Sequence, residues 1–286
     1  MEWKSSLQEP RAWLGALGIA LAGLQLTVLE FSKAPNLMSL SILVWLAIAS
    51  LIWDKRDELK FHSSVFSSVF GATLIIFVLI RSLSPVGYHL TVSPLICGVG
   101  LALMASGFKG LSSYWKELTI LALLASSSIL TGILNAINLP QLTAKFSNGS
   151  LWTAGFKSYR EGVSIILPTG RVEVYGSCSG VESILLMFFV GVLFLFIIPI
   201  KRIQQVICLS VAVFIGFITN AIRVSIMAVL VASSQREAFE YWHGDDGSLI
   251  FALISVLIFG VFCWFAYVRS LTLTSEIDED FLIDEE

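Results

Sequence analysis

Long apolar stretches, separated by short polar ones, run through most of the chain. In hydrocarbon every backbone N–H and C=O group must find a partner within the protein, so each long apolar run predicts a helix. A membrane span needs about 20 residues, with a range of roughly 17–25. The pattern therefore predicts an all-α polytopic membrane protein with about eight transmembrane helices. Seven of the runs cover approximately residues 13–29, 37–53, 65–83, 91–108, 118–139, 180–200 and 248–268, and the remaining one begins near residue 203.

A long polar segment, residues 140–177, separates the fifth and sixth runs. Within it, residues 163–167 and 171–175 alternate apolar and polar side chains on either side of Pro168-Thr169-Gly170. This alternation around turn residues is typical of a β-hairpin. The hairpin would deliver Cys178 to the start of the sixth helix at a fixed angle.

Composition agrees with a protein that lies mostly in lipid. Hydrophobic residues make up 56 % of the 286 residues and charged residues only 14 %, whereas a soluble domain has about 25 % charged residues. The net charge is −3, and no basic stripe indicates nucleic-acid binding. The four cysteines have no spacing typical of a disulfide framework or a zinc site. Three of them lie inside apolar runs, where a cysteine usually packs as a small hydrophobic residue.

The lysines and arginines of short loops predict the orientation, because such residues favour the cytoplasmic side. With the N-terminus inside, Lys33, Arg81, Arg236 and the 140–177 segment face outward, so both termini lie in the cytoplasm and Cys178 lies at the outer face of the plasma membrane. The cytoplasmic side then carries Lys4, Arg11, Lys55, Arg56, Lys60, Lys109, Lys116, Lys201, Arg202 and Arg269.

These boundaries divide the chain into four regions. Residues 1–139 form an N-terminal five-helix membrane region, and residues 140–177 form an extracytoplasmic loop with the hairpin. Residues 178–269 form a second membrane region that carries the candidate chemistry. Residues 270–286 form an acidic cytoplasmic tail, most simply a solvated, disordered end.

Cys178 differs from the other cysteines because it lies where the polar loop meets the sixth run, within residues 176–183. The dipole and unpaired N–H groups of a helix start favour the thiolate, which is the nucleophilic form. The alternative is an ordinary loop cysteine beside small residues. Glu182 follows four residues later, on the same predicted helix face, where it could position a catalytic group.

Arg223 is charged but lies within the seventh apolar run. Ionisable residues within spans are costly and usually functional, although an arginine near the interface can also extend its charged end into water. Asn220 precedes it by three residues, so both side chains project from one helix face. A guanidinium beside a reacting carbonyl would stabilise the developing oxyanion.

His243 follows two aromatic residues, 241–242, that suit a membrane interface. Histidine is the usual general acid or base near neutral pH, but a solvated loop histidine is the simpler interpretation of this residue alone. Asp245 and Asp246 could orient His243 or bind a cation. Such a pair more often forms a turn and N-cap, here before a helix starting near residue 248.

The seventh run, residues 203–234, is too long for one ordinary span and short for two. Two spans would put His243 on the opposite side of the membrane from Cys178. We therefore favour one span followed by a bent or interfacial continuation, with Asn220 and Arg223 near its outer end. This interpretation assumes that Cys178 and His243 share a face.

Three motifs in this order resemble the exosortase/archaeosortase family. They are Gly-Ser-Cys178-Ser-Gly at a span start, Asn220-x-x-Arg223, and His243-x-x-x-Gly247 before a last span. The similarity covers roughly residues 155–265, and the first five spans match only as apolar helices. The Cys-Ser-Gly-Val-Glu-Ser and Trp-His-Gly-Asp-Asp-Gly stretches look most like the cyanobacterial branch.

Members of that family are viewed as sorting transpeptidases. They act on exported proteins whose C-terminal tail has a short Pro-Glu-Pro-like motif, one transmembrane helix and a basic cluster. The resemblance implies Cys178 as nucleophile, Arg223 as stabiliser and His243 as acid and base, with no metal or organic cofactor. Its partners would be such exported proteins and membrane lipid, and the reaction would pass through a thioester to a surface acceptor or water.

Other functions leave different signatures. A rhomboid-type serine protease would need Gly-x-Ser-x-Gly in a span, and a zinc intramembrane protease would need His-Glu-x-x-His; neither motif is present. A transporter could use Arg223 as a substrate anchor, but transporters often have two related halves with polar groups at mid-membrane. Here the polar groups gather near one face, in one half of the chain. A non-catalytic membrane scaffold is the third alternative.

Overall fold

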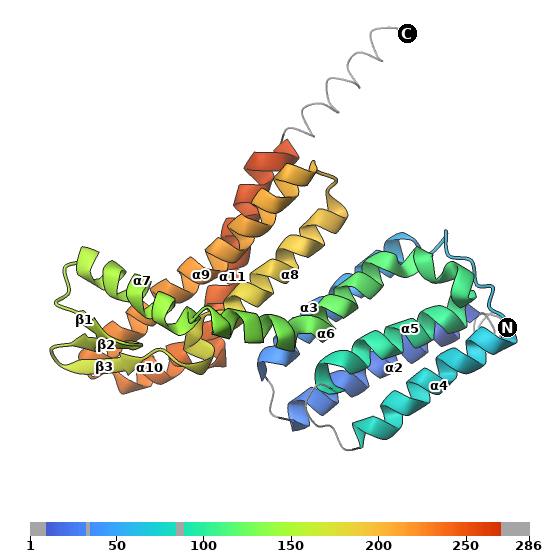
Figure 1. Ribbon diagram of the computed structural model, residues 1–286, viewed down its shortest axis with the longest axis horizontal. Helices are drawn as coiled ribbons and strands as arrows, with labels where there is room; N and C mark the ends of the chain where they lie inside the picture. The colour runs from blue at the N-terminus through green and yellow to red at the C-terminus, as the bar shows by residue number, and fades with distance from the viewer. Residues whose placement is uncertain (1–9, 33–34, 84–88, 270–286) are drawn as a thin grey trace, which may run out of the picture. The chain divides into compact units, whose positions relative to one another are not determined.

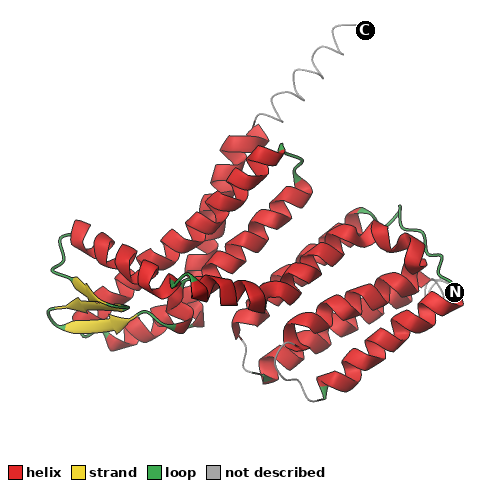
Figure 2. Cartoon of the chain, in the orientation of Figure 1, coloured by secondary structure: helices red, strands yellow, loops and turns green. Residues whose placement is uncertain are grey.

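The chain is mostly helical (Figures 1 and 2). The computed structural model describes residues 10–32, 35–83 and 89–269, so the predicted acidic tail at 270–286 lies outside the described residues. The chain divides into two compact units, Met1–Leu130 and Thr131–Glu286. The division into four regions at residues 139, 177 and 269 remains a prediction.

The first unit consists of antiparallel and kinked apolar helices. A partly buried ion pair fixes one end of it, because Lys55 Nζ lies 2.7 Å from Glu117 Oε2 and also donates to the carbonyl of Ser113 at 2.6 Å. Gly107 has a φ of +66° where α5 (His89–Gly110) bends toward a short 3₁₀ turn. Its elements are α2 (Pro10–Phe31), α3 (Pro35–Asp54), α4 (Val65–Ser82), α5 (His89–Gly110), η1 (Leu111–Tyr114) and α6 (Trp115–Ala136), the last of which continues into the second unit.

Six helices of the described chain are long and apolar enough to cross a membrane, not the eight that we predicted. The difference has two causes. The predicted fourth and fifth spans count as one stretch, His89–Ala136. The chain turns back within it, because Gly107 is non-helical and a Cβ atom at Gly98 on α5 would meet the side chain of Leu121 on α6. The predicted sixth span is α8 (Val181–Ile197), whose 17 residues are at the lower limit of the roughly 17–25 that a span needs, so it is not among the six.

In the second unit, three apolar helices run side by side, and the polar elements gather around one end of the longest (Figure 1). The apolar helices are α8, α9 (Arg202–Ala232) and α11 (Asp245–Cys263), the last extended by the π-helical turn η3 (Trp264–Val268). The polar elements are α7 (Leu139–Thr153), β1 (Tyr159–Glu161), β2 (Ser164–Leu167), β3 (Gly170–Glu173), the 3₁₀ turn η2 (Gly176–Ser179) and α10 (Arg236–His243).

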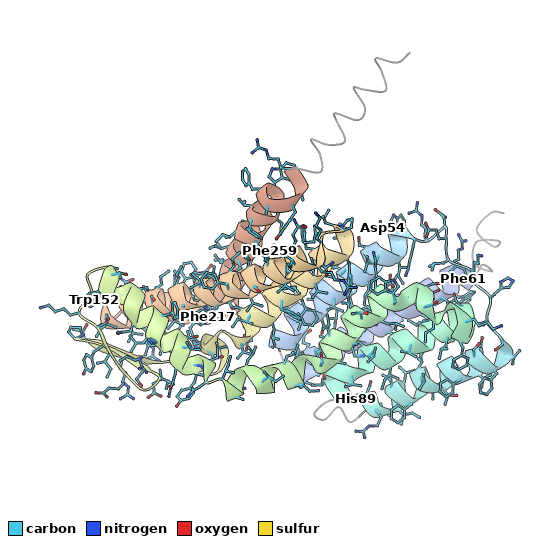
Figure 3. All side chains as sticks on the ribbon, turned by 45° about the horizontal axis from the view of Figure 1, so that its top comes forward. Asp54, Phe61, His89, Trp152, Phe217 and Phe259 are labelled. Atoms are coloured by element: carbon cyan, nitrogen blue, oxygen red, sulfur yellow. The ribbon has the colours of Figure 1, made fainter. Side chains whose placement is uncertain are left out.

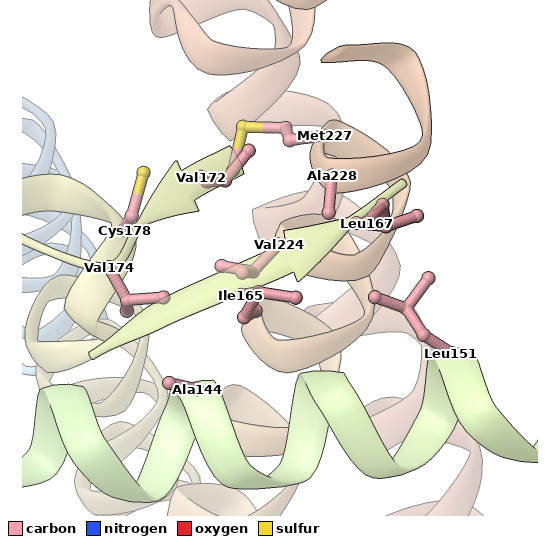
Figure 4. Packing of buried hydrophobic residues seen from close by; sticks show 10 residues of the cluster. All are labelled: Ala144, Leu151, Ile165, Leu167, Val172, Val174, Cys178, Val224, Met227 and Ala228. Carbon is pink, nitrogen blue, oxygen red and sulfur yellow. The ribbon is translucent and has the colours of Figure 1, made fainter. Parts of the chain in front are cut away.

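The predicted hairpin is part of a three-stranded antiparallel sheet with the strand order β1-β2-β3. Strands β2 and β3 pair with Leu167 opposite Gly170, so the turn lies at Pro168-Thr169 as the sequence indicated. The third strand, β1, was not predicted because its three residues are all exposed and show no alternation. One face of the sheet is buried, since Ile165, Leu167 and Val172 belong to a hydrophobic cluster with residues of α9 (Figure 4).

Helix α7 corrects the interpretation of residues 140–177 as a loop. It covers 15 residues, with Pro140 in its first turn, where the missing N–H costs nothing. Its buried face consists of Leu139, Thr143, Ala144, Ser147 and Leu151. The helical spacing of this face is present in the sequence, but the face contains small polar residues in place of large apolar ones.

Helix α9 settles the path of the seventh run. It is one uninterrupted helix of 31 residues through Asn220 and Arg223. The chain then turns at Ser234, which has a φ of +57°, and continues into the short helix α10. The structure therefore contains one candidate span followed by a separate bent continuation, as we favoured.

Candidate functional site

Cys178 lies in the one-turn 3₁₀ helix η2, and its side chain is only 3 % exposed. Its backbone N–H donates to the carbonyl of Tyr175 at 3.0 Å. Helix α8 begins at Val181, after Gly180 with a φ of +92°. Cys178 therefore precedes the helix instead of occupying it, and the predicted helical i,i+4 relation to Glu182 is wrong, because the left-handed glycine changes the chain direction between them.

Two buried side chains hold the turn that carries Cys178. Asn220 Nδ2 donates to the carbonyl of Cys178 at 3.0 Å, and Thr143 Oγ1 donates to the carbonyl of Ser179 at 2.7 Å. A Cβ atom at Gly180 would lie 3.0 Å from Asn220 Nδ2. A glycine is thus required here both by its positive φ and by the close approach of Asn220.

The thiol lies in an apolar environment between the sheet and α9. Its neighbours in the hydrophobic cluster include Val172, Val174, Val224 and Met227 (Figure 4). Arg223 lies within electrostatic range of this thiol. A nearby guanidinium favours the reactive thiolate, whereas the apolar surroundings favour the neutral thiol.

Arg223 is 2 % exposed and is held by backbone carbonyls. Its Nε donates to the carbonyl of Trp242 at 3.0 Å and its Nη2 to the carbonyl of His243 at 2.8 Å. Within the described part of the chain its Nη1 makes no hydrogen bond and its guanidinium forms no salt bridge. Burial of a charge without a close counter-ion is costly, which favours a functional over a purely structural arginine.

The two carbonyls belong to the corner between α10 and α11. Gly247 lies against this corner so closely that a Cβ atom there would be 2.5 Å from Trp242 Cα and 2.7 Å from the oxygen of Trp242. Only glycine permits that approach. This close packing explains the glycine at the end of the His243-x-x-x-Gly247 motif, because it places the carbonyls that hold Arg223.

His243 is the last residue of α10, and its side chain is exposed. Its ring stacks on that of Phe239, with centroids 5.4 Å apart and an interplanar angle of 14°. The structure thus brings the backbone of His243, and not its ring, into hydrogen-bond contact with Arg223.

Asp245 and Asp246 occupy the first turn of α11, and Gly244 is the N-cap. The prediction of an aspartate N-cap before a helix near residue 248 is therefore wrong by a few residues. Both carboxylates suit this position because a helix N-terminus stabilises negative charge. Glu182 is half-buried in the first turn of α8 and interacts electrostatically with Arg223 and Asp245.

Sequence reasoning missed Thr143 and the hydroxyl contacts that follow it on α7. Ser147 Oγ donates to the carbonyl of Ala221 at 2.8 Å, and Ser150 Oγ lies 2.7 Å from Ser225 Oγ. These contacts fix α7 along the part of α9 that carries Asn220 and Arg223. The signal in the sequence is the helical spacing of the small polar residues at 143, 147 and 150, which could have predicted these contacts.

The position of Arg223 along α9 gives its depth. Arg223 is 21 residues beyond the first residue of the helix, which is about 32 Å at 1.5 Å per residue. The hydrocarbon core of a bilayer is about 30 Å thick. With the start of α9 at one membrane face, Arg223 and the turn of Cys178 lie at the opposite face.

Fold and site together define a class: a multi-pass helical membrane protein in which a cysteine turn, a buried arginine and a histidine corner meet at one end of a helix group. No group of three or more His, Cys, Asp or Glu side chains that could hold a metal ion occurs in the described ranges. The chain belongs to the transmembrane exosortase family (Exosortase_EpsH), whose model matches residues 33–260.

Membership of this family confirms the resemblance seen in the motifs. It implies a transpeptidase that processes sorting signals, and exosortases are generally taken to be cysteine transpeptidases. The match begins in the first unit, so the earlier helices also belong to the family pattern and are more than generic apolar spans. No curated protein and no solved structure matched the chain.

Proposed function

We propose that this protein is a cysteine transpeptidase that cleaves the C-terminal sorting tails of exported proteins at the outer face of the plasma membrane. Cys178 is the nucleophile, Arg223 stabilises the oxyanion, and His243 transfers protons. Asn220 holds the catalytic turn, and Glu182, Asp245 and Asp246 set the charge around Arg223. The observation that carries the proposal is the 3.0 Å hydrogen bond from Asn220 to the carbonyl of Cys178, because it joins the turn of the thiol to the part of α9 that carries the buried Arg223.

The proposed course is as follows. The sulfur of Cys178 attacks the carbonyl carbon of the scissile peptide bond, and its proton passes to the imidazole of His243, which must leave its stacking contact with Phe239 to reach the sulfur. Arg223 Nη1, which has no partner among the described residues, donates to the oxygen that gains negative charge. When the C–N bond breaks, the imidazole returns the proton to the departing amine, and an acyl thioester remains on Cys178.

The second step regenerates the thiol. An amine or other nucleophile at the cell surface attacks the thioester carbonyl, the C–S bond breaks, and the sulfur regains a proton. The substrate is an exported protein with a Pro-Glu-Pro-like motif followed by one transmembrane helix. That helix would bring the scissile bond to the depth at which α9 places Arg223.

The test is a reporter protein with such a tail, expressed together with the full-length protein and followed by its mass on a gel. We expect Cys178→Ala to abolish cleavage. Arg223→Ala removes one oxyanion donor and should reduce the rate about 100-fold. Cys208→Ala, a buried cysteine in a different hydrophobic cluster, should cleave at the wild-type rate. Cleavage that persists in Cys178→Ala at equal membrane levels would reject the thiol mechanism.

A further inference from the structure

A groove of about 470 Å³ lies on the second unit, between the end of α7 and the sheet. Three exposed aromatic side chains line it: Trp152 is 72 % exposed, Tyr159 57 % and Phe156 40 %. Figure 3 shows Trp152 at the C-terminal end of α7. Large aromatic side chains that remain exposed together on a small domain mark a binding surface.

Two polar groups in this groove have no partner in the described part of the chain. Lys157 is exposed and forms no ion pair or hydrogen bond there. The hydroxyl of Ser158 is buried and makes no hydrogen bond. A buried hydroxyl without a partner is costly, and this one belongs to a residue that lines the groove. The free ammonium group favours a ligand with a negative charge.

The contacts of α7 give the position of the groove relative to Cys178. Helix α7 runs in the same direction as α9, because Ser147 contacts Ala221 and Ser150 contacts Ser225. Thr143 contacts the residue after Cys178, and Trp152 is nine residues further along α7. Nine residues rise at most about 14 Å in this direction. The other side of the groove gives the same level, because Thr169, next to the lining residue Pro168, donates to the carbonyl of Ala232. Ala232 is nine residues, or about 14 Å, beyond Arg223 on α9, so the groove lies about 14 Å beyond the level of Arg223 and the thiol.

This distance argues against a lipid as the occupant. The polar headgroup region adds only about 5–8 Å to each side of the hydrocarbon core. With Cys178 at the membrane face, a groove about 14 Å further out lies beyond the headgroups. It faces the space through which the exported part of a substrate must pass.

We infer that this groove binds an extended segment of the substrate on the exported side of the scissile bond, and that Lys157 pairs with an acidic residue of that segment. The inference rests on the proposed function. An extended chain advances about 3.3 Å per residue, so the acidic residue lies at least four residues before the cleaved bond.

The chemistry of the groove suits an extended peptide. Aromatic-lined grooves bind extended, proline-containing segments at low entropic cost. The groove borders β1, an outer strand of the sheet whose three residues are exposed. An outer strand also offers backbone groups to a segment that runs alongside it. Ser158 can donate to, or accept from, the backbone of such a segment.

Charge reversal on both partners tests the inference in full-length protein. Lys157→Glu should slow cleavage of a reporter with a glutamate in this segment about tenfold, and Lys157→Gln about threefold. Replacing the reporter glutamate with lysine should slow the wild-type protein but restore cleavage by Lys157→Glu. Lys145→Gln, on α7 outside the groove lining, is the matched control and should leave the rate unchanged.

A binding measurement separates this inference from the proposed reaction. Fluorescence anisotropy of a labelled acidic peptide, with the detergent-solubilised Cys178→Ala protein, should report binding that Lys157→Glu weakens. If Lys157→Glu and wild type cleaved the reporter and bound the peptide equally, the proposed role of the groove would be rejected while the proposed reaction would stand. Quenching of Trp152 fluorescence by lipid-borne spin labels would also overturn it, because the groove would then rest on the membrane. If only the proposed thiol mechanism were wrong, Cys178→Ala would still cleave the reporter, and Lys157→Glu would still weaken binding of the peptide.

Discussion

Arg223 keeps its positive charge available because its close partners are neutral. Arginines buried in proteins usually form bidentate pairs with carboxylates, which largely cancel the charge. Here the two hydrogen bonds go to carbonyl oxygens of Trp242 and His243. Glu182 and Asp245 act on the guanidinium only through longer-range electrostatics. The geometry of the side chain is thus fixed by the backbone, while its charge remains free to act on an oxyanion.

Thr143 offers a test of how the turn of Cys178 is held. Thr143→Val removes the hydroxyl that donates to the carbonyl of Ser179 and leaves a buried carbonyl without that donor, which costs about 1–3 kcal/mol. We expect lower thermal stability in detergent and slower reporter cleavage. Thr143→Ser retains the hydroxyl and should restore most of the rate.

Thr153→Val is the matched control, since Thr153 is exposed at the end of the same helix. If Thr143→Val behaved like Thr153→Val in both measurements, Thr143 would have no role in positioning the thiol.

At the scale of single residues, the sequence led to Cys178, Arg223 and His243 through their order and spacing, and these roles remain predictions. It could not lead to the groups that hold Arg223, because every residue has a backbone carbonyl and none is marked in a sequence. It also could not reveal that the ring of His243 would stack on Phe239 while its carbonyl receives Arg223. Such contacts follow from the fold of α10 against α9.

Among the elements, the long apolar helices were the most predictable. The third run, predicted at residues 65–83, is α4 at Val65–Ser82, because burial in lipid requires both helical backbone and apolar side chains. Helix α7 escaped prediction for the opposite reason. It packs on protein through Thr143, Ala144 and Ser147, and small polar side chains give little hydrophobic periodicity.

The corner between α10 and α11 gives a prediction at the scale of elements. In Gly247→Ala the new methyl group would lie 2.5 Å from Trp242 Cα, so the corner must move and Arg223 must lose or lengthen a carbonyl hydrogen bond. Overpacking of this kind costs about 1–3 kcal/mol. We expect reporter cleavage to fall about tenfold or more, since small displacements of catalytic groups are costly.

The comparison variant is Gly260→Ala in the same helix, where a Cβ atom would meet no other atom within 4 Å. This variant should retain both the protein level and the rate. If Gly247→Ala were as active as Gly260→Ala, the corner would not position Arg223.

For the whole molecule, the orientation in the membrane is a prediction from the distribution of lysine and arginine. We expect green fluorescent protein fused after Glu286 to fluoresce in the cytoplasm. Alkaline phosphatase inserted at Gly162, in the exposed turn between β1 and β2, should be active outside. If the phosphatase at Gly162 were inactive and the C-terminal fusion did not fluoresce, the orientation would be the opposite of the predicted one. The reaction would then take place on the cytoplasmic side.

The length of α8 sets a condition on the surrounding lipid. Its 17 residues reach only about 26 Å, whereas α9 beside it exceeds the roughly 30 Å of hydrocarbon. This negative hydrophobic mismatch must thin the bilayer locally or draw the turn of Cys178 below the membrane surface. Acyl-chain length is therefore a determinant of how readily water and a polar acceptor reach the thiol, and membranes of different thickness are not equivalent hosts for this protein.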